Sequence, residues 1–159
     1  EIKEIERKKN IASIENEKLQ QDIENKNREL AVSTMSMIKK NQFLNKIKND
    51  LKKIESDQLV KKVIKTIDKN LSNEDDWKFF QEAFNNADSE FLKKIKSVHN
   101  ELTKNDLKLC AYLRLNLSSK DIAPLLNISV RSVEIKRYRL RKKMKLSHNE
   151  GLTEYILSI

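Results

Sequence analysis

The chain has 159 residues, of which 38% are hydrophobic and 36% are charged, and its formal net charge is +9. The sequence has one glycine and one proline, so it offers few residues for the tight turns that join strands, and the composition favours elongated helices. With a single glycine there is no glycine-rich phosphate loop, which excludes an ATP-binding kinase domain within these residues. The only cysteine, Cys110, excludes an internal disulfide and is expected to be a small core residue.

The positive charge is unevenly distributed along the chain. Residues 102–159 hold 12 basic and 5 acidic groups, whereas residues 1–101 hold 21 and 19, so the C-terminal part is expected to bind a polyanion. No apolar run approaches the roughly 18 residues that a membrane-spanning helix needs, and no signal peptide is visible. We expect a cytoplasmic segment without membrane contact. The helical pattern is already under way at Ile2, which indicates a fragment of a longer protein.

A heptad repeat over residues 2–54 predicts a parallel dimeric coiled coil as the first domain, residues 1–55. Eleven of the sixteen a and d positions are apolar, and Asn16 at an a position favours parallel helices in fixed register. The a positions are Ile2, Lys9, Asn16, Ile23, Leu30, Met37, Leu44 and Leu51, and the d positions are Ile5, Ala12, Leu19, Lys26, Ser33, Lys40, Ile47 and Ile54. The predicted dimer interface consists of Ile23, Leu30, Met37, Leu44 and Leu51. The alternative is a long helix that packs against other helices of its own chain.

A helical connector is predicted over residues 56–100. Apolar residues from Leu59 to Leu71 form a wider stripe than a two-stranded coiled coil needs, which indicates a helix that folds back in a local bundle. Two further helices follow, and their expected caps are Ser72 or Asn73 and then Asp88. Their expected buried residues are Trp77, Phe80, Phe84, Phe91, Leu92, Ile95 and Val98.

The C-terminal domain, residues 101–159, is predicted to contain four helices. Thr103 and Asp106 resemble a capping box at the start of the first helix. The fourth helix carries an apolar stripe that is longer than such a small core needs, so we expect a second dimer contact there. The residues expected in this contact are Leu152, Tyr155 and Ile156.

The two middle helices of this domain have helix-turn-helix spacing. A short helix over Ser119–Leu126 is joined by a tight turn to a longer segment, Ile128–Leu146, which Ser129 can cap. We interpret this longer segment as a DNA recognition helix with its entry turn. Its apolar residues Val133, Leu140 and Met144 share one face and are expected to be buried.

The opposite face of the predicted recognition helix is cationic, with eight Lys or Arg against one Glu from Arg131 to Lys145. Residues near the centre of this face are expected to contact bases, and these are Arg131, Glu134, Ile135 and Tyr138. Flanking cations reach less deeply and are expected to contact phosphates, and these are Lys120, Lys136, Arg139, Arg141 and Lys142. The alternative interpretation is a solvated helix face that binds no DNA.

A set of residues between Leu102 and Ser147 recurs with the spacing of a known family: Leu102, Thr103, Ser118, Lys120, Ile122, Ala123, Leu126, Ile128, Ser129, Val133, Lys143 and Met144. In these residues the segment resembles the LuxR-type helix-turn-helix. The departures are Asn116 for the usual glycine, Ser132 for Thr, Glu134 for a common Lys and Lys136 for a common His. Because Glu134 reverses the charge at a position that faces the groove, the family's base contacts are not transferred to this chain.

The sequence from Arg114 to Met144 also resembles the C-terminal output region of membrane-anchored bacterial sensor-regulators that carry a periplasmic β-propeller and a triple-tyrosine domain. The resemblance implies a DNA-binding domain in the cytoplasmic part of a larger inner-membrane sensor. Together with the patterns above, it leads us to expect an all-α fold with a long N-terminal coiled-coil helix, a helical connector and a C-terminal four-helix domain of the LuxR type.

These patterns predict a sequence-specific transcription regulator that binds double-stranded DNA as a homodimer and is not an enzyme. The main alternative is a dimerisation and signalling scaffold whose helical module binds protein. A histidine-kinase dimerisation domain would require phosphorylation of His99, which lacks a following proline. His99 and His148 are too few and too far apart in sequence to indicate a metal site, and we expect no cofactor and no small-molecule ligand.

Overall fold

The computed structural model describes residues 1–54, 57–71 and 74–159, and all the regular structure in these residues is helical. The all-α prediction is therefore confirmed. The helices are α1 (Ile2–Lys52), α2 (Gln58–Leu71), α3 (Glu74–Ala87), α4 (Phe91–Val98), α5 (Lys104–Arg114), α6 (Ser119–Leu126), α7 (Val130–Lys143) and α8 (Leu152–Ser158). None of the described helices is both long enough and apolar enough to cross a bilayer.

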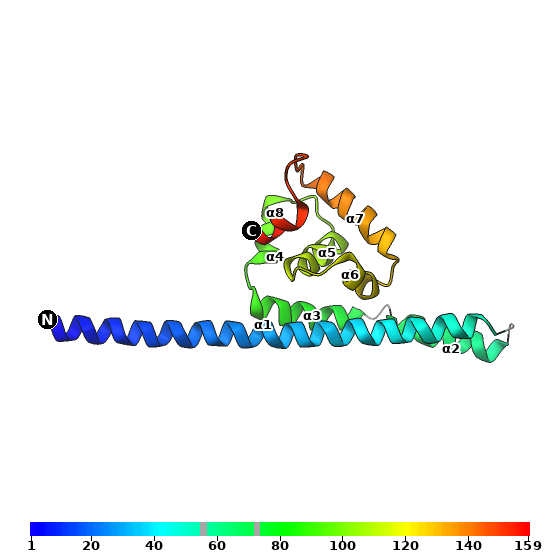
Figure 1. Cartoon of the computed structure of the whole chain (residues 1–159), viewed down its shortest axis with the longest axis horizontal. Helices are drawn as coiled ribbons and strands as arrows, with labels where there is room; N and C mark the ends of the chain where they lie inside the picture. Colours follow the sequence, from blue (N-terminus) through cyan, green and yellow to red (C-terminus); the bar gives the residue numbers. More distant parts are fainter. Residues whose placement is uncertain (55–56, 72–73) are drawn as a thin grey trace.

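Helix α1 forms the long axis of the molecule, and α2 and α3 run back along it in the opposite direction (Figure 1). The predicted fold-back of the connector is thus confirmed. Leu30, Thr34, Ile38 and Asn41 are the residues of α1 that this packing and the contact with α6 bury. The preceding residues, 1–29, are exposed along a part of α1 that extends away from the rest of the chain (Figure 1).

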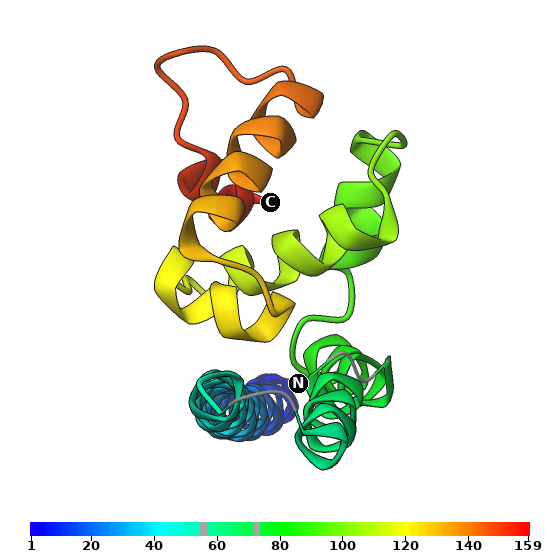
Figure 2. The same ribbon diagram turned by 90° about the vertical axis from the view of Figure 1, so that its right-hand side faces the viewer.

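Helices α5 to α8 lie together above the middle of α1, with α6 directly over it (Figure 2). Aromatic rings join the two parts, because Tyr112 of α5 lies 4.9 Å from Phe80 and 6.0 Å from Trp77 of α3, measured between ring centroids. One apolar cluster therefore extends from Leu30 of α1 to Ile156 of α8. The C-terminal helices share their core with the connector.

Local hydrogen bonds define where the C-terminal helices begin. The predicted capping box is present: the Asp106 backbone N–H donates to Thr103 Oγ1 at 3.2 Å, and the Thr103 N–H donates to the Asp106 carboxylate at 2.9 Å. The predicted cap of α7 is also present, because the Ser132 N–H donates to Ser129 Oγ at 3.1 Å. These side chains satisfy backbone donors that the first helical turn leaves without intrahelical partners.

Two predictions for the connector are wrong. Asp88 does not cap α4, whose N-cap is Glu90, because its carboxylate instead accepts a 2.9 Å hydrogen bond from Arg114 Nε. Val98 is 57% exposed rather than buried, because it is the last residue of α4, where the helix leaves the core. The predicted cap at Ser72 or Asn73 lies outside the described residues.

Candidate nucleic-acid interface

The α6–α7 pair is positioned by its caps and by its turn. Ser118 and Asp121 form a second capping box at the start of α6. Their Ser-x-x-Asp spacing signals such a box, although it is not among the predicted caps. Asn127 then adopts the left-handed conformation (φ 52°) that asparagine tolerates better than most residues, and this turns the chain into α7 within a few residues. These local interactions set where α6 ends and where α7 begins.

Helix α7 buries one face and exposes the other. Val133 and Leu140 are 0% exposed and Met144 is 4% exposed, as the periodicity predicts. Most of the predicted DNA-contact residues lie on the solvent side: Arg131, Glu134, Ile135, Lys136, Tyr138, Arg139 and Lys142 from α7, and Lys120 from α6. Lys142 Nζ lies 4.7 Å from the centroid of the Tyr138 ring, so the cation and the aromatic ring form one surface.

Glu134 has a partner within its own chain. Its carboxylate accepts a hydrogen bond from Ser119 Oγ of α6, and the same Oγ accepts one from Arg137 Nη1 at 3.3 Å. Arg137 also donates to Thr153 Oγ1 of α8 at 3.2 Å. Glu134, the only acidic residue of α7, therefore lies on the exposed face and also belongs to a hydrogen-bonded network of side chains that links α6, α7 and α8.

Arg141 differs from the other predicted phosphate contacts. Its guanidinium donates to the backbone carbonyls of Ser147 and Glu150, in the segment that connects α7 to α8. These two bonds hold the guanidinium of Arg141 against this connecting segment. The residue is thus placed as a support for the α7–α8 connection, whereas Lys136, Arg139 and Lys142 remain exposed.

Lys143 also supports the domain. Its Nζ donates to the Asp106 carboxylate at 2.6 Å, which links α7 to the start of α5. Burial alone raises the pKa of Asp106, but the hydrogen bonds from Lys143 and Thr103 outweigh this effect and hold the pKa below its usual value. Above its normal pKa, Asp106 is therefore a carboxylate that favours the folded state, and this contribution is lost as the pH falls through the lowered pKa.

The predicted dimer-interface residues of α1 differ in their accessibility. Ile23 is 44% exposed, whereas Leu30 is 2% exposed and packs in the core of its own chain. Met37, Leu44 and Leu51 are half-buried within the chain. From Leu30 onward α1 packs against α2, α3 and α6, so the alternative that the sequence left open describes this part of the helix.

The predicted dimer contact on α8 is also largely used within the chain. Leu152 and Ile156 are 7% and 0% exposed, because the short helix buries its stripe against α5. Tyr155 is half-buried, and its hydroxyl lies 2.6 Å from His99 Nε2. Arg114 of α5 donates to the carbonyls of Ile156 and Leu157 at 3.0 and 2.9 Å, which holds the end of α8 in place.

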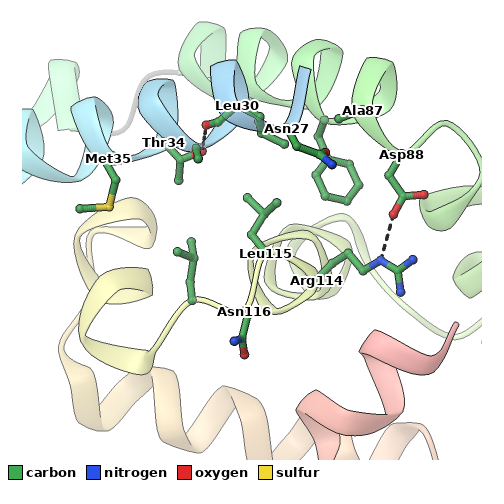
Figure 3. Close-up of a pocket in the computed structure, with 12 residues that line it drawn as sticks. Asn27, Leu30, Thr34, Met35, Ala87, Asp88, Arg114, Leu115 and Asn116 are labelled. Carbon is green, nitrogen blue, oxygen red and sulfur yellow. Dashed lines mark hydrogen bonds and ion pairs between the residues drawn. The ribbon is translucent and has the colours of Figure 1, made fainter. Parts of the chain in front are cut away.

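An apolar groove lies where α1, α3 and the end of α5 meet (Figure 3). Leu30 and Met35 of α1 and Leu115, after α5, line it, and the Asp88–Arg114 ion pair closes one end. Thr34 lines the groove too, but its hydroxyl is used in a 2.7 Å hydrogen bond to the Leu30 carbonyl. The groove offers shape and apolar contact without a cluster of reactive side chains.

The cysteine, the one side chain that could act as a thiol nucleophile, is a core residue. Cys110 is fully buried, and burial, with a smaller effect of Asp106, raises the pKa of its thiol to about 12. A thiol with this pKa is not a nucleophile at neutral pH.

Comparisons with protein-family models, curated proteins and solved structures return no match to this chain.

Proposed function

We propose that residues 101–159 form a LuxR-type helix-turn-helix that binds double-stranded DNA, and that the chain is the output segment of a transcription regulator. The observation that carries this proposal is the two-sided character of α7. Its apolar face is fully buried, and its solvent face combines Arg131, Ile135 and Tyr138 with flanking cations. An exposed cationic helix that is supported from behind suits the major groove, which admits one α-helix.

The residues that carry the LuxR resemblance have consistent physical roles in the chain, which supports the proposal. Three of the apolar ones, Leu102, Ile122 and Val133, are at most 2% exposed. Thr103, Ser118 and Ser129 each cap a helix. Asn116, which replaces the usual glycine, has φ 58°, a conformation that glycine adopts freely and asparagine tolerates.

The proposed division of labour at the interface follows from these positions. Arg131, Glu134, Ile135 and Tyr138 face the bases, with Glu134 also held by Ser119. Lys120, Lys136, Arg139 and Lys142 contact phosphates. Arg141 is left out of the phosphate contacts because its guanidinium is bonded to two backbone carbonyls.

Duplex binding measured over a range of salt concentrations tests the proposal. Each phosphate contact releases counterions, so log K should fall linearly with log salt concentration by roughly 0.9 per contact, and these four contacts alone contribute about 3 to 4 units for each bound chain. Fluorescence anisotropy of a labelled duplex of mixed sequence measures this slope directly. The second candidate function, a scaffold whose helical module binds protein, predicts no salt-dependent duplex binding, and such a result would reject the proposal.

A further inference from the structure

The positive charge of the N-terminal part is concentrated in one stretch. Residues 39–71 contain ten lysines and four acids, a balance of +6, whereas residues 1–38 and 72–101 carry −1 and −3. In the fold this stretch is the end of α1 together with α2, two antiparallel helices that we call the α1–α2 hairpin. A second cationic region thus lies outside the C-terminal domain.

The hairpin is adjacent to the proposed DNA interface. Lys46 of α1 lines an open groove together with Lys120 of α6 and with Ser129 and Val130 at the start of α7. Lys53 follows Lys46 by seven residues, so both lie on the same face of the helix. Both side chains are exposed, and Lys53 keeps 78% of its side-chain surface while it pairs with Asp50 at 3.4 Å.

The hairpin extends beyond the N-terminal end of α7, and α7 is inclined to it (Figure 1). The major groove is roughly 12 Å wide, so a duplex that holds α7 in this groove has phosphates on both sides of the helix, and those near its N-terminal end face the side on which the hairpin lies. The surface that it meets there carries Lys46 and Lys53. Because exposed cations near phosphates release counterions, this contact is attractive.

We infer that the end of the α1–α2 hairpin is a second phosphate-binding surface, in which Lys46 and Lys53 contact the backbone of the duplex that α7 reads. The inference rests on the proposed function. It explains how α1 would take part in DNA binding without contacting a base. These contacts add affinity for any sequence and leave the preference between sequences unchanged.

The double variant Lys46→Ala/Lys53→Ala tests the inference in the full chain. With a labelled mixed-sequence duplex of about 30 base pairs, the salt slope should fall by roughly 1.8 units, which is two contacts at about 0.9 each. The ratio of affinities for two unrelated duplexes should not change. Circular dichroism establishes that the helices are intact, and Lys46→Glu/Lys53→Glu should weaken binding further.

The matched control is Lys3→Ala/Lys18→Ala, because these lysines are also exposed on α1 and lie outside the a and d positions, in the half that extends away from α7 (Figure 1). This control should keep the slope of the unmodified chain. An unchanged slope for the Lys46→Ala/Lys53→Ala variant would overturn the inference. Tighter binding by this variant would overturn it as well, because the two lysines would then weaken duplex binding. Salt-independent binding by the unmodified chain would instead reject the proposed function itself.

Discussion

At the scale of single residues, neighbouring cations of α7 have different roles. Lys142 is exposed on the solvent face, whereas Arg141 bonds two carbonyls of the α7–α8 connection. Lys142→Ala should reduce the salt slope of duplex binding by about one unit and leave stability unchanged. Arg141→Ala should leave the slope unchanged and lower the free energy of unfolding by about 1 to 3 kcal/mol, because it leaves carbonyls without their charged donor.

The measurements are anisotropy titrations over salt and urea denaturation, applied to both variants. Each variant is the control for the other, since they differ by one position along the same helix. A loss of slope in Arg141→Ala without a loss of stability would show that the guanidinium contacts phosphate, as the sequence analysis predicted.

The buried thiol of Cys110 leads to a prediction about stability at alkaline pH. Its pKa is about 12 in the fold and about 9 ordinarily, so between these values the unfolded chain loses a proton that the folded chain keeps. The free energy of unfolding should therefore fall with rising pH, by about 1.4 kcal/mol per unit from this group. The buried Tyr112, whose pKa is also raised, adds to the loss at higher pH.

Urea denaturation at pH 9, 10 and 11 measures this slope, and Cys110→Ala is the matched variant. The variant should be less stable at neutral pH because it leaves a cavity, but its stability should decline less steeply as the pH rises. Parallel pH profiles for the two chains would contradict the assignment of the loss to the buried thiol.

At the scale of elements, α1 has two differently packed parts. Its first part is solvent-exposed and keeps apolar residues at heptad positions, with Ile5 66% and Leu19 59% exposed. We predict that this part forms the parallel dimer. Leu19→Asp should place a carboxylate in the seam and cost several kcal/mol, enough to dissociate a dimer of ordinary affinity, and light scattering should report half the mass.

Ile14→Asp is the control for this change. Ile14 is 65% exposed but lies outside the a and d positions, so the same charge there should leave the mass unchanged. Equal effects of the two substitutions would indicate a non-specific apolar association, and an unchanged mass for Leu19→Asp would reject the seam.

At the scale of the whole molecule, the C-terminal domain and the connector share one core that reaches Leu30 of α1. Leu30→Ala should therefore lower the free energy of unfolding by about 2 to 5 kcal/mol in a single transition. The fluorescence of Trp77 of α3, whose ring packs against Tyr112 of α5, reports this transition. Leu19→Ala, in the exposed part of α1, should leave the midpoint of this transition unchanged. An equal effect of both substitutions would show that α1 does not pack against the rest of the chain as described.

The sequence by itself determined the helical elements and the caps of α5 and α7, because these depend on contacts within a few residues. The periodicity of Val133, Leu140 and Met144 predicts the buried face of α7, and the pairs Thr103–Asp106 and Ser129–Ser132 form their hydrogen bonds locally. The exposed cationic face of α7 was predictable for the same reason, since a regular helix assigns each residue a direction.

Only the tertiary structure decided which partner each face meets. The heptad of α1 does not distinguish a second chain from α2, α3 and α6, since either covers an apolar stripe, and Leu30 is buried by its own chain. The role of Arg141 depends on where the α7–α8 connection folds, and the position of Lys46 beside Lys120 depends on how α6 packs on α1. These contacts join residues far apart in the chain, so no local pattern encodes them.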